Sequence, residues 1–367
     1  MTTAPAALHF AVTSHGLGHL TRSLAVLRAL QELRPDARLH VSTTANPEWI
    51  RGQLDHPVEI RDCDYEPGAL QRNCFEVDVP ATRLAYRKFR DEHAARLERE
   101  LAFLRAHDFA GVVTDISGLA VHAAAEAGLP AIGVSNFTWD WIIEPWCENA
   151  APEEAELPEL LRADYARGTT QLRLPFGPDR SSFPTSEPAP LVARTATRTR
   201  AEVRRVLGFG DEPLAVVCPG GWSADEWPAI VARPGRFRLI TVGDLPVTAN
   251  PEPLALSHEL PGGLRFPDLV AGADVVLGKP GYGLASECLR HRVPFAMIER
   301  PEFRETPHLV QEVLAAGHGS TATIDQFFAG DWEPMLERAL IEGTEWTPQP
   351  EDPAGEIARR ILEICGA

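Results

Sequence analysis

The chain has 367 residues, of which 44% are hydrophobic. This length is too great for a domain with one ordinary core and suits two domains of ~150–200 residues each. Asp and Glu (52) outnumber Lys and Arg (35), and the formal charge of -17 would repel nucleic acid phosphates and anionic lipid surfaces, so neither is an expected partner. Nowhere does the sequence approach the ~20 consecutive apolar residues of a membrane span, and its start lacks the pattern of a secretory signal, so we expect a cytoplasmic protein.

The cysteines are scattered along the sequence, without a C-x-x-C pair or a tight cluster with histidine. We expect reduced thiols, which argues against a disulfide scaffold and against a structural zinc. The six positions are Cys63, Cys74, Cys147, Cys218, Cys288 and Cys365.

Short β-branched runs alternate with helix-period segments, the pattern of parallel sheets covered by helices, so the fold class is α/β. In the first half a helix over 20–34 is predicted, because Leu20, Leu24 and Leu27 recur at a spacing of three or four residues. The strands predicted in this half are 8–14, 38–44, 58–63, 111–115, 131–136 and 171–176.

The segment 177–190 is poor in apolar residues and rich in Pro and Ser, which favours an exposed linker. We therefore expect an N-terminal domain over 1–180 and a C-terminal domain over 181–350. A last helix over 355–365 carries apolar residues at helical spacing and must bury one face. The strands predicted after the linker are 214–219, 238–242, 264–266, 274–277, 295–299 and 320–324.

The first polar segment that suggests chemistry, Ser-His-Gly-Leu-Gly-His-Leu-Thr-Arg over 14–22, joins a predicted strand to a helix. Gly16 and Gly18 let the backbone approach a ligand, and the N-terminus of a helix attracts negative charge. His15 and His19 place bases of near-neutral pKa at the sheet edge where α/β proteins bind ligands. The alternative is a tight turn with solvated histidines.

Asp115 ends the strand predicted at 111–115, on the same edge of the sheet. An acid there can orient a histidine ring and stabilise its protonated form, as the third member of a catalytic triad does. Asp at a strand end is also a common turn or capping residue, and for Asp115 by itself that interpretation is the better one.

The most informative pattern lies over 274–287, where a buried strand runs into a glycine-rich turn and then a helix. The backbone N–H groups of the turn and the Lys279 ammonium can hold a diphosphate, and Glu287 can accept hydrogen bonds from ribose hydroxyls. The pattern predicts a nucleotide-diphosphate site, although a glycine turn of this kind is only moderately specific.

Three partial motifs are rejected or weak. The spacing from Gly272 to Lys279 is one residue too long for a P-loop, and Pro280 replaces the hydroxyl that binds magnesium. The segment 280–286 resembles the phosphate loop of galactokinase-like kinases, but the Ser-Ser run that should follow is absent. Asp-Cys-Asp over 62–64 mimics a metal-binding D-x-D pair, yet nothing nearby completes such a site.

These segments together resemble GT-B glycosyltransferases, which have two Rossmann-like domains facing a cleft. The turn over 16–22 is similar to the G-x-G-H turn of the lipid I N-acetylglucosaminyltransferase. Asp115 falls where plant UDP-glycosyltransferases keep the Asp partner of their catalytic His, and 281–287 has the G-x5-E spacing of their donor signature. A fuller resemblance, over nearly the whole chain, is to the N-terminal glycosyltransferase-like domain of plant L-arabinokinases, whose kinase half has no counterpart here. It rests on the segments 15–22, 136–140, 173–175, 190–192, 278–287 and 355–358.

The resemblance implies that a sugar is transferred, with inversion, from a nucleotide-diphosphate donor to a hydroxyl of a small acceptor. A UDP-sugar is the first candidate for the donor, and neither a metal nor a cofactor is expected. His19 would be the base, oriented by Asp115, with His15 as runner-up, and a helix over 351–367 would return to the N-terminal domain. The acceptor would contact His15, Gly16, Gly18, Asn136 and Trp139, and the donor diphosphate Gly220, Gly221, Lys279, Gly281, Tyr282 and Gly283.

The chain departs from this family at two places. Glu305-Thr306 stands where plant enzymes hold the donor sugar with an Asp-Gln pair, and Phe266 replaces the base-stacking Trp, so thymidine and guanosine donors stay open beside uridine. Two other functions stay open as well: a nucleotide-sugar 2-epimerase, and a non-catalytic protein that binds sugar nucleotides. A homodimer is compatible with the sequence.

Overall fold

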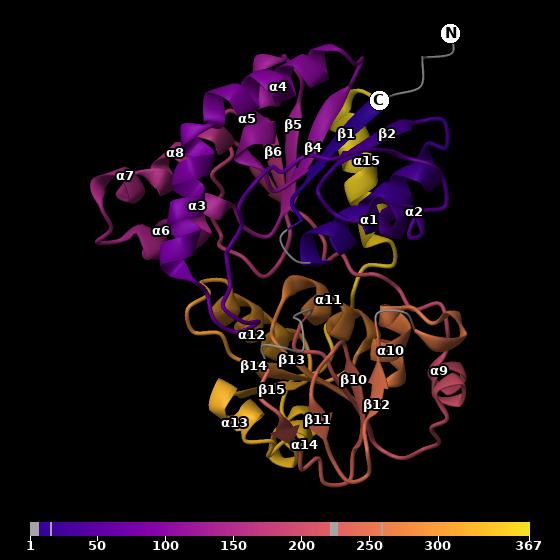
Figure 1. Cartoon of the computed structure of the whole chain (residues 1–367). Helices are drawn as coiled ribbons and strands as arrows, with labels where there is room; N and C mark the ends of the chain where they lie inside the picture. Colours follow the sequence, from indigo (N-terminus) through magenta and orange to yellow (C-terminus); the bar gives the residue numbers. More distant parts are fainter. Residues whose placement is uncertain (1–6, 15–16, 221–226, 258–259) are drawn as a thin grey trace. The chain divides into compact units, whose positions relative to one another are not determined.

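A computed structural model describes residues 7–14, 17–220, 227–257 and 260–367. Its contacts divide the chain into two compact units (Figure 1). Unit 1 consists of Met1–Leu70, Asp78–Val192 and Pro350–Ala367, and unit 2 of Gln71–Val77 and Ala193–Gln349. Each unit is built around its own parallel sheet.

The sheet of unit 1 has seven parallel strands in the order β3-β2-β1-β4-β5-β6-β7. Its central strands are buried along their whole length, which explains their continuous apolar runs. The strands are β1 (Ala7–Val12), β2 (Arg38–Ser42), β3 (Glu59–Arg61), β4 (Gly111–Asp115), β5 (Ala131–Ser135), β6 (Thr170–Arg173) and β7 (Ser186–Pro188).

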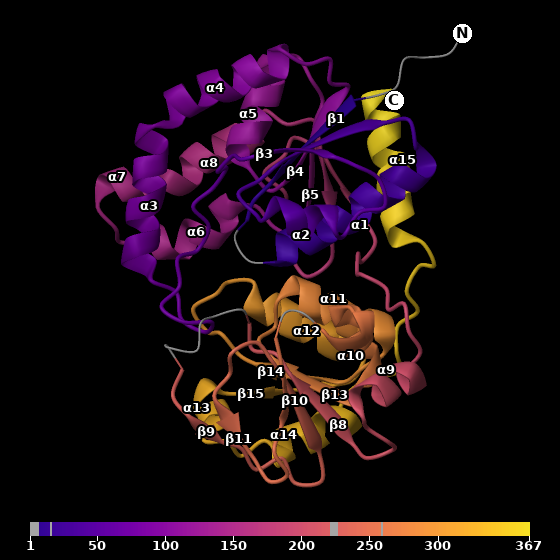
Figure 2. The same ribbon diagram turned by 45° about the vertical axis from the view of Figure 1, so that its right-hand side comes forward.

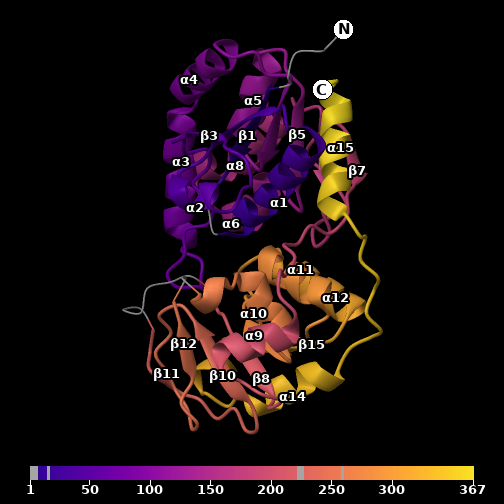
Figure 3. The same cartoon turned by 90° about the vertical axis from the view of Figure 1, so that its right-hand side faces the viewer.

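Helices cover both faces of this sheet (Figure 3). On one face α1 packs against α15, whose Ile357 and Ile361 are buried as the helical spacing predicts, and on the other face α4, α5 and α8 lie together. The helices are α1 (Leu17–Leu33), α2 (Pro47–Arg51), α3 (Val79–Asp91), α4 (His93–Arg105), α5 (Gly118–Glu126), α6 (Trp139–Cys147), α7 (Pro152–Ala155), α8 (Leu157–Tyr165) and α15 (Pro353–Cys365).

The sheet of unit 2 has six parallel strands in the order β12-β10-β8-β13-β14-β15, and a small parallel pair, β9 and β11, lies apart from it. Figure 2 shows α10, α11 and α12 on one face of the sheet and α14 on the other. The strands are β8 (Leu214–Val217), β9 (Ile230–Val231), β10 (Arg238–Val242), β11 (Val247–Thr248), β12 (Leu254–Leu256), β13 (Val275–Gly278), β14 (Phe295–Ile298) and β15 (Gly319–Ala322). The helices are α9 (Arg200–Leu207), η2 (Pro261–Gly263), α10 (Phe266–Gly272), α11 (Tyr282–His291), α12 (Thr306–Ala316), α13 (Ile324–Phe328) and α14 (Glu333–Ile341).

Both sheets share one strand order. Counting only the strands of the main sheet, the first strand of each sheet lies between the second and the fourth, so the chain turns in opposite directions on leaving two neighbouring strands. In unit 1 these neighbours are β1 and β4, and in unit 2 they are β8 and β13. Ligands of doubly wound proteins bind at the carboxyl ends of such strands, so the loops after these four strands are the first places to look for a site.

Two sequence predictions are wrong. The strand predicted at 264–266 is absent: β12 takes the sheet edge, and Phe266 begins α10, because Asp268 accepts a hydrogen bond from the Arg265 N–H at 2.7 Å and Pro267 suits the first turn. The segment 177–190 is more than a linker, because it contributes β7 to the sheet. Pro188 in β7 is tolerated there because the strand lies at an edge.

Unit 2 also takes a short segment from within the sequence of unit 1. The side chain of Phe75, in Gln71–Val77, is buried in the core of unit 2, with its ring centroid 5.5 Å from that of Phe327 and 5.8 Å from that of Trp227. The backbone N–H of Val77 donates to Glu302 at 3.2 Å. These contacts hold the segment on unit 2.

Within the described residues, no helix is both long enough and apolar enough to cross a membrane.

Candidate active site

The carboxyl ends of β1 and β4 in unit 1 are held together by hydrogen bonds. Val12 pairs with Asp115 in the sheet, and the next residue, Thr13, donates to the Asp115 carbonyl from both its N–H (3.0 Å) and its hydroxyl (3.1 Å). The loop into α1 therefore starts at a fixed position beside the Asp115 side chain.

His19 and Asp115 are in contact. His19 Nδ1 lies 2.8 Å from Asp115 Oδ1, and both side chains are buried. Burial favours the protonated acid, but the Arg22 guanidinium and His19 outweigh it and hold the pKa of Asp115 below its usual value. Arg22 Nη2 lies 2.9 Å from the same Nδ1, but it donates to Asp115 Oδ1 at the shorter distance of 2.5 Å. Because an ionised carboxylate only accepts hydrogen bonds, we assign the proton of the neutral ring to Nδ1, which leaves the lone pair on Nε2.

Arg22 completes this cluster. Its Nε and Nη2 each lie 2.5 Å from one oxygen of Asp115, a two-point contact, and its Nη1 donates to Asn136 Oδ1 at 2.8 Å. Arg22 was predicted only as a member of the turn motif, with no role of its own. The signal was its spacing from His19, because residues three apart on a helix share a face and both therefore reach Asp115.

The pKa of His19 is lowered chiefly by burial, with Asp115 raising it and Arg22 lowering it. The ring is therefore neutral at pH 7. It is packed between Phe137 and Trp139, whose ring centroids lie 5.9 and 6.1 Å away. Nε2 makes no hydrogen bond with any residue that the structure describes, so it is available to accept a proton.

The residues expected to contact the acceptor do not all line one open surface. Asn136 and Trp139 are fully buried, so their side chains support Arg22 and His19. Gly18 lies in the first turn of α1, where its carbonyl accepts from the Thr21 hydroxyl. His15 and Gly16 lie outside the described residues.

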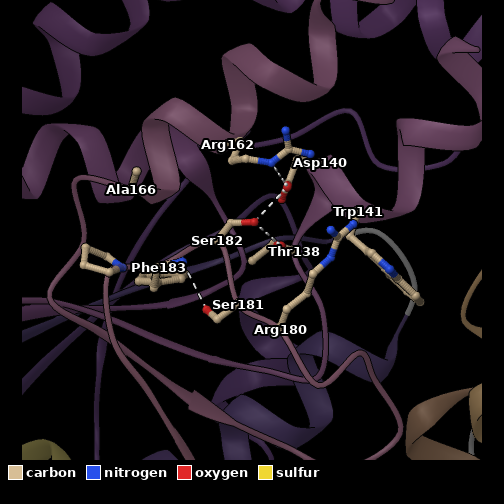
Figure 4. A pocket seen from close by; sticks show the side chains of 10 residues that line it. Thr138, Asp140, Trp141, Arg162, Ala166, Arg180, Ser181, Ser182 and Phe183 are labelled. Carbon is tan, nitrogen blue, oxygen red and sulfur yellow. Dashed lines mark hydrogen bonds and ion pairs between the residues drawn. The ribbon is translucent and has the colours of Figure 1, made fainter.

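Residues that follow Phe137 line a pocket of about 470 Å³ in unit 1 (Figure 4). Asp140 Oδ2 accepts from the Ser182 hydroxyl at 2.8 Å and from Arg162 Nε at 3.3 Å. Asp140 Oδ1 is buried and has no hydrogen-bond partner among the described residues. Trp141 adds an aromatic wall. A pocket with a carboxylate, hydroxyls, a guanidinium and an indole suits a small molecule that carries hydroxyl groups.

In unit 2 the first residues after neighbouring strands again come together. Lys279 follows β13, and Gly220 follows β8 by a short loop in which its φ is +132°. This φ favours glycine, and a Cβ on Gly220 would lie 2.9 Å from Lys279 Cε, so a larger residue would displace the end of the lysine side chain. Burial, reinforced by Arg300, lowers the pKa of Lys279 to about 8. Gly221 lies outside the described residues.

Arg300 is a second cation at this edge, and the sequence analysis missed it. Its Nε and Nη2 are buried and make no hydrogen bond in the described part of the chain, while its guanidinium lies 4.5 Å above the Phe303 ring. Burial lowers the pKa of Arg300, against the effect of Glu305. The signal was its position just beyond the apolar run of β14, which neighbours β13.

The N-terminus of α11 faces the same edge. Gly281 is its N-cap and offers no side-chain acceptor to the first N–H groups, which begin at Tyr282 and Gly283. A Cβ on Gly281 would meet nothing within 4 Å, so the turn is open. The N-terminus of a helix beside two cations, Lys279 and Arg300, suits an anion.

The expected ribose and base residues are also brought together. Arg194 Nε donates to Glu287 Oε1 at 2.6 Å, and its guanidinium lies 5.9 Å from the Phe266 ring. Glu287 Oε2 is buried without a partner among the described residues, and burial raises the pKa of this acid against the effect of Arg194. Glu305 and Thr306 lie buried at the start of α12.

Comparison with known proteins supports this reading of the fold. No family model matches the chain. It is 30% identical over 361 residues to the L-arabinokinase of Arabidopsis thaliana, covering 96% of this chain and 34% of that protein, so it spans about a third of the relative's length. The predicted resemblance to L-arabinokinases is thereby confirmed.

Solved structures show the fold. A UDP-glucosyltransferase from Polygonum tinctorium capable of glucosylating indoxyl matches with a TM-score of 0.62 and 13% identity over the whole of both chains. The glycosyltransferase VinC in complex with dTDP matches with a TM-score of 0.57 and 14% identity, over 98% of this chain and 95% of that one. The chain has the GT-B fold of glycosyltransferases, as predicted.

Proposed function

We propose that the chain is a glycosyltransferase that moves a sugar from a nucleotide-diphosphate donor to a hydroxyl of a small acceptor. The observation that carries this proposal is a neutral histidine, held through Nδ1 by an ionised Asp115 and open at Nε2, at the strand edge where a GT-B fold binds its ligands. One structural relative is a UDP-glucosyltransferase and another holds dTDP, which supports a nucleotide-diphosphate donor of either base.

In the proposed reaction, His19 Nε2 takes the proton of the acceptor hydroxyl as its oxygen attacks the anomeric carbon of the donor. The bond from this carbon to the diphosphate oxygen breaks, and its electron pair leaves with the nucleoside diphosphate, so the anomeric configuration is inverted. Asp115 keeps accepting from Nδ1–H and stabilises the imidazolium that forms. Arg22 keeps Asp115 ionised throughout.

We place the donor on unit 2. The diphosphate would bind Lys279, Arg300 and the first N–H groups of α11, which stabilise the charge that develops on the leaving oxygen. Glu287 Oε2, which is buried and unbonded within the described residues, would accept from a ribose hydroxyl. Phe266 would contact the base, and Glu305 with Thr306 the transferred sugar.

We place the acceptor in the pocket beside α6. The rings of His19 and Phe137 are 5.9 Å apart and those of Phe137 and Trp141 are 6.4 Å apart, so the pocket wall lies two ring contacts from the base. Asp140 Oδ1 would accept from an acceptor hydroxyl. An Asp140→Asn enzyme should then have a raised KM for the acceptor and an unchanged affinity for the donor.

A panel of UDP-, dTDP- and GDP-sugars, incubated with the protein and a set of small hydroxylated acceptors, tests the proposal. We expect release of the nucleoside diphosphate only when an acceptor is present, and none with His19→Ala. Isomerisation of the donor sugar without an acceptor would instead identify an epimerase. Donor binding without turnover across a broad acceptor set would identify a binding protein.

A further inference from the structure

A second group of ligand-type side chains lies in unit 1 among residues that the transfer reaction does not use. His93 is the first residue of α4, His122 lies in α5 and Asp164 lies in α8, and these helices pack together on one face of the sheet (Figure 1). Gly118 allows this close packing, because a Cβ there would lie 3.2 Å from Asp164 Cβ.

The three donor atoms are spaced like ligands of one ion. His93 Nε2 lies 3.2 Å from His122 Nδ1 and 3.7 Å from Asp164 Oδ1, and the latter two atoms are 2.9 Å apart. A tetrahedral ion with bonds of ~2.0–2.1 Å has ligand atoms ~3.3–3.4 Å apart. A single ion can therefore bond all three atoms after shifts of a few tenths of an ångström.

Protons alone do not satisfy this group. A proton on His122 Nδ1 suits Asp164, but His93 Nε2 must then present a lone pair. His93 would carry its proton on Nδ1, which lies 3.1 Å from Arg90 Nη1, another donor. If the His93 proton is on Nε2, two N–H groups face each other across 3.2 Å. Either way one close contact lacks an acceptor.

A metal ion matches the three atoms of the centre, because each then presents a lone pair to it, and only the Nδ1–H of His93 still faces a donor, Arg90, among the contacts described above. The Nδ1–H of His93 would lose its contact with Arg90, which stays bound to Asp164 Oδ2 at 2.5 Å, the stronger, charge-assisted bond. His122 Nε2 lies 3.8 Å from Glu126 Oε1, in position to donate to a carboxylate while Nδ1 binds the ion. The positive charge of Arg90 acts against the ion and limits its affinity.

We propose that His93, His122 and Asp164 bind a divalent transition-metal ion such as Zn²⁺, which links α4, α5 and α8. Two imidazoles and one carboxylate suit zinc and its transition-metal neighbours better than Mg²⁺, which prefers oxygen ligands. Water completes the coordination. None of these three residues has a role in the proposed sugar transfer, so the two proposals are tested separately.

Calorimetric titration of the chelator-treated, untagged full chain with ZnCl₂ tests the site. We expect one Zn²⁺ per chain and no heat from MgCl₂. His122→Ala and Asp164→Asn should each weaken zinc binding at least ~10-fold. Arg90→Gln should tighten it several-fold, because it removes the repelling charge. His56→Ala, which replaces an exposed histidine, is the matched control and should bind zinc like the wild type.

No zinc binding at 1:1 stoichiometry, or equal affinity in wild type and His122→Ala, would overturn the proposal. Because these variants could fail to fold, crystals of the wild type soaked in zinc provide a second measurement. An anomalous peak bonded to His93, His122 and Asp164 supports the site. A soaked crystal with zinc bound only at other histidines counts against it.

Discussion

The two candidate sites use buried charge in opposite ways. In unit 1, the Asp115 carboxylate is matched by two bonds from Arg22, one from His19 and a longer one from the Ser23 hydroxyl. In unit 2, burial and the charge of Arg300 lower the pKa of Lys279, and two buried nitrogens of Arg300 have no hydrogen-bond partner in the described part of the chain. Both sites lie at carboxyl ends of strands in sheets of the same order.

The contrast separates a reactive group from a binding group. A catalytic base has to keep its geometry before the substrate arrives, so the protein supplies the partners of Asp115 and leaves His19 Nε2 without a bond to any described residue. A site for a diphosphate instead retains unmatched positive charge, which costs stability without ligand and is recovered on binding. The comparison predicts that substitutions at the two sites differ in kind.

The largest effect should come from the base itself. His19→Ala removes the proton acceptor, and we expect kcat to fall ~10³-fold or more, at the upper end of what general base catalysis contributes. The affinity for a nucleoside diphosphate, measured by calorimetry, should stay unchanged, because the donor binds unit 2. Wild-type kcat in this variant would remove the proposed mechanism.

The next effect is on the stability of each unit, and we expect opposite results for the two units. Arg22→Met leaves the buried Asp115 unpaired, which should destabilise unit 1 by ~3–5 kcal/mol. Arg300→Met removes a cation that has no hydrogen-bond partner among the described residues, so unit 2 should keep or gain stability while its affinity for nucleoside diphosphate falls.

Hydrogen exchange measures the two sheets separately, through the amides of β4 and of β14. We expect faster exchange in β4 of Arg22→Met and no acceleration in β14 of Arg300→Met. Equal losses of protection in the two variants would show that Arg300 is matched like Arg22, and the comparison would break.

Much of the fold could be predicted from the sequence, because buried parallel strands are continuous apolar runs that alternate with helices. The contact of His19 with Asp115, 96 positions apart, also followed, since the carboxyl ends of parallel strands share one sheet edge. Roles at that edge were harder to predict. Arg22 and Arg300 are charged residues that sequence patterns assign to solvent, and only tertiary packing buries them.

Of two misses, one has a local cause and the other a long-range one. The residues 264–266 have an apolar, strand-like pattern, but the cap formed by Asp268 and the ring of Pro267 favour a helix. The transfer of Gln71–Val77 to unit 2 depends on Phe75 finding an aromatic cluster far along the chain. No local periodicity encodes such a partner, so it was not predictable.

A smaller effect sharpens the comparison within unit 2. Glu287→Ala removes the acceptor proposed for the ribose and leaves Arg194 without its carboxylate, so donor binding should weaken by ~1–3 kcal/mol. Calorimetry with the nucleoside diphosphate and with inorganic pyrophosphate separates the contributions. Pyrophosphate affinity should stay near wild type, since it depends on Lys279 and Arg300. An unchanged affinity for the nucleotide would show that Glu287 only pairs with Arg194.

The smallest effect is a pH dependence that unit 1 should not share. The pKa of Lys279 is lowered to about 8, so its charge is complete below that pH and is lost as pH rises through it. A bound diphosphate favours the charged form, so affinity for nucleoside diphosphate should hold at pH 7 and fall ~10-fold by pH 9. Burial raises the pKa of the nearby Cys218 to about 11 and of Cys74 to about 12, so neither thiol titrates in this range. Lys279→Arg keeps its charge at every pH tested, and its affinity should stay level from pH 7 to 9. The same decline in Lys279→Arg would place the titrating group elsewhere and remove Lys279 from the donor site.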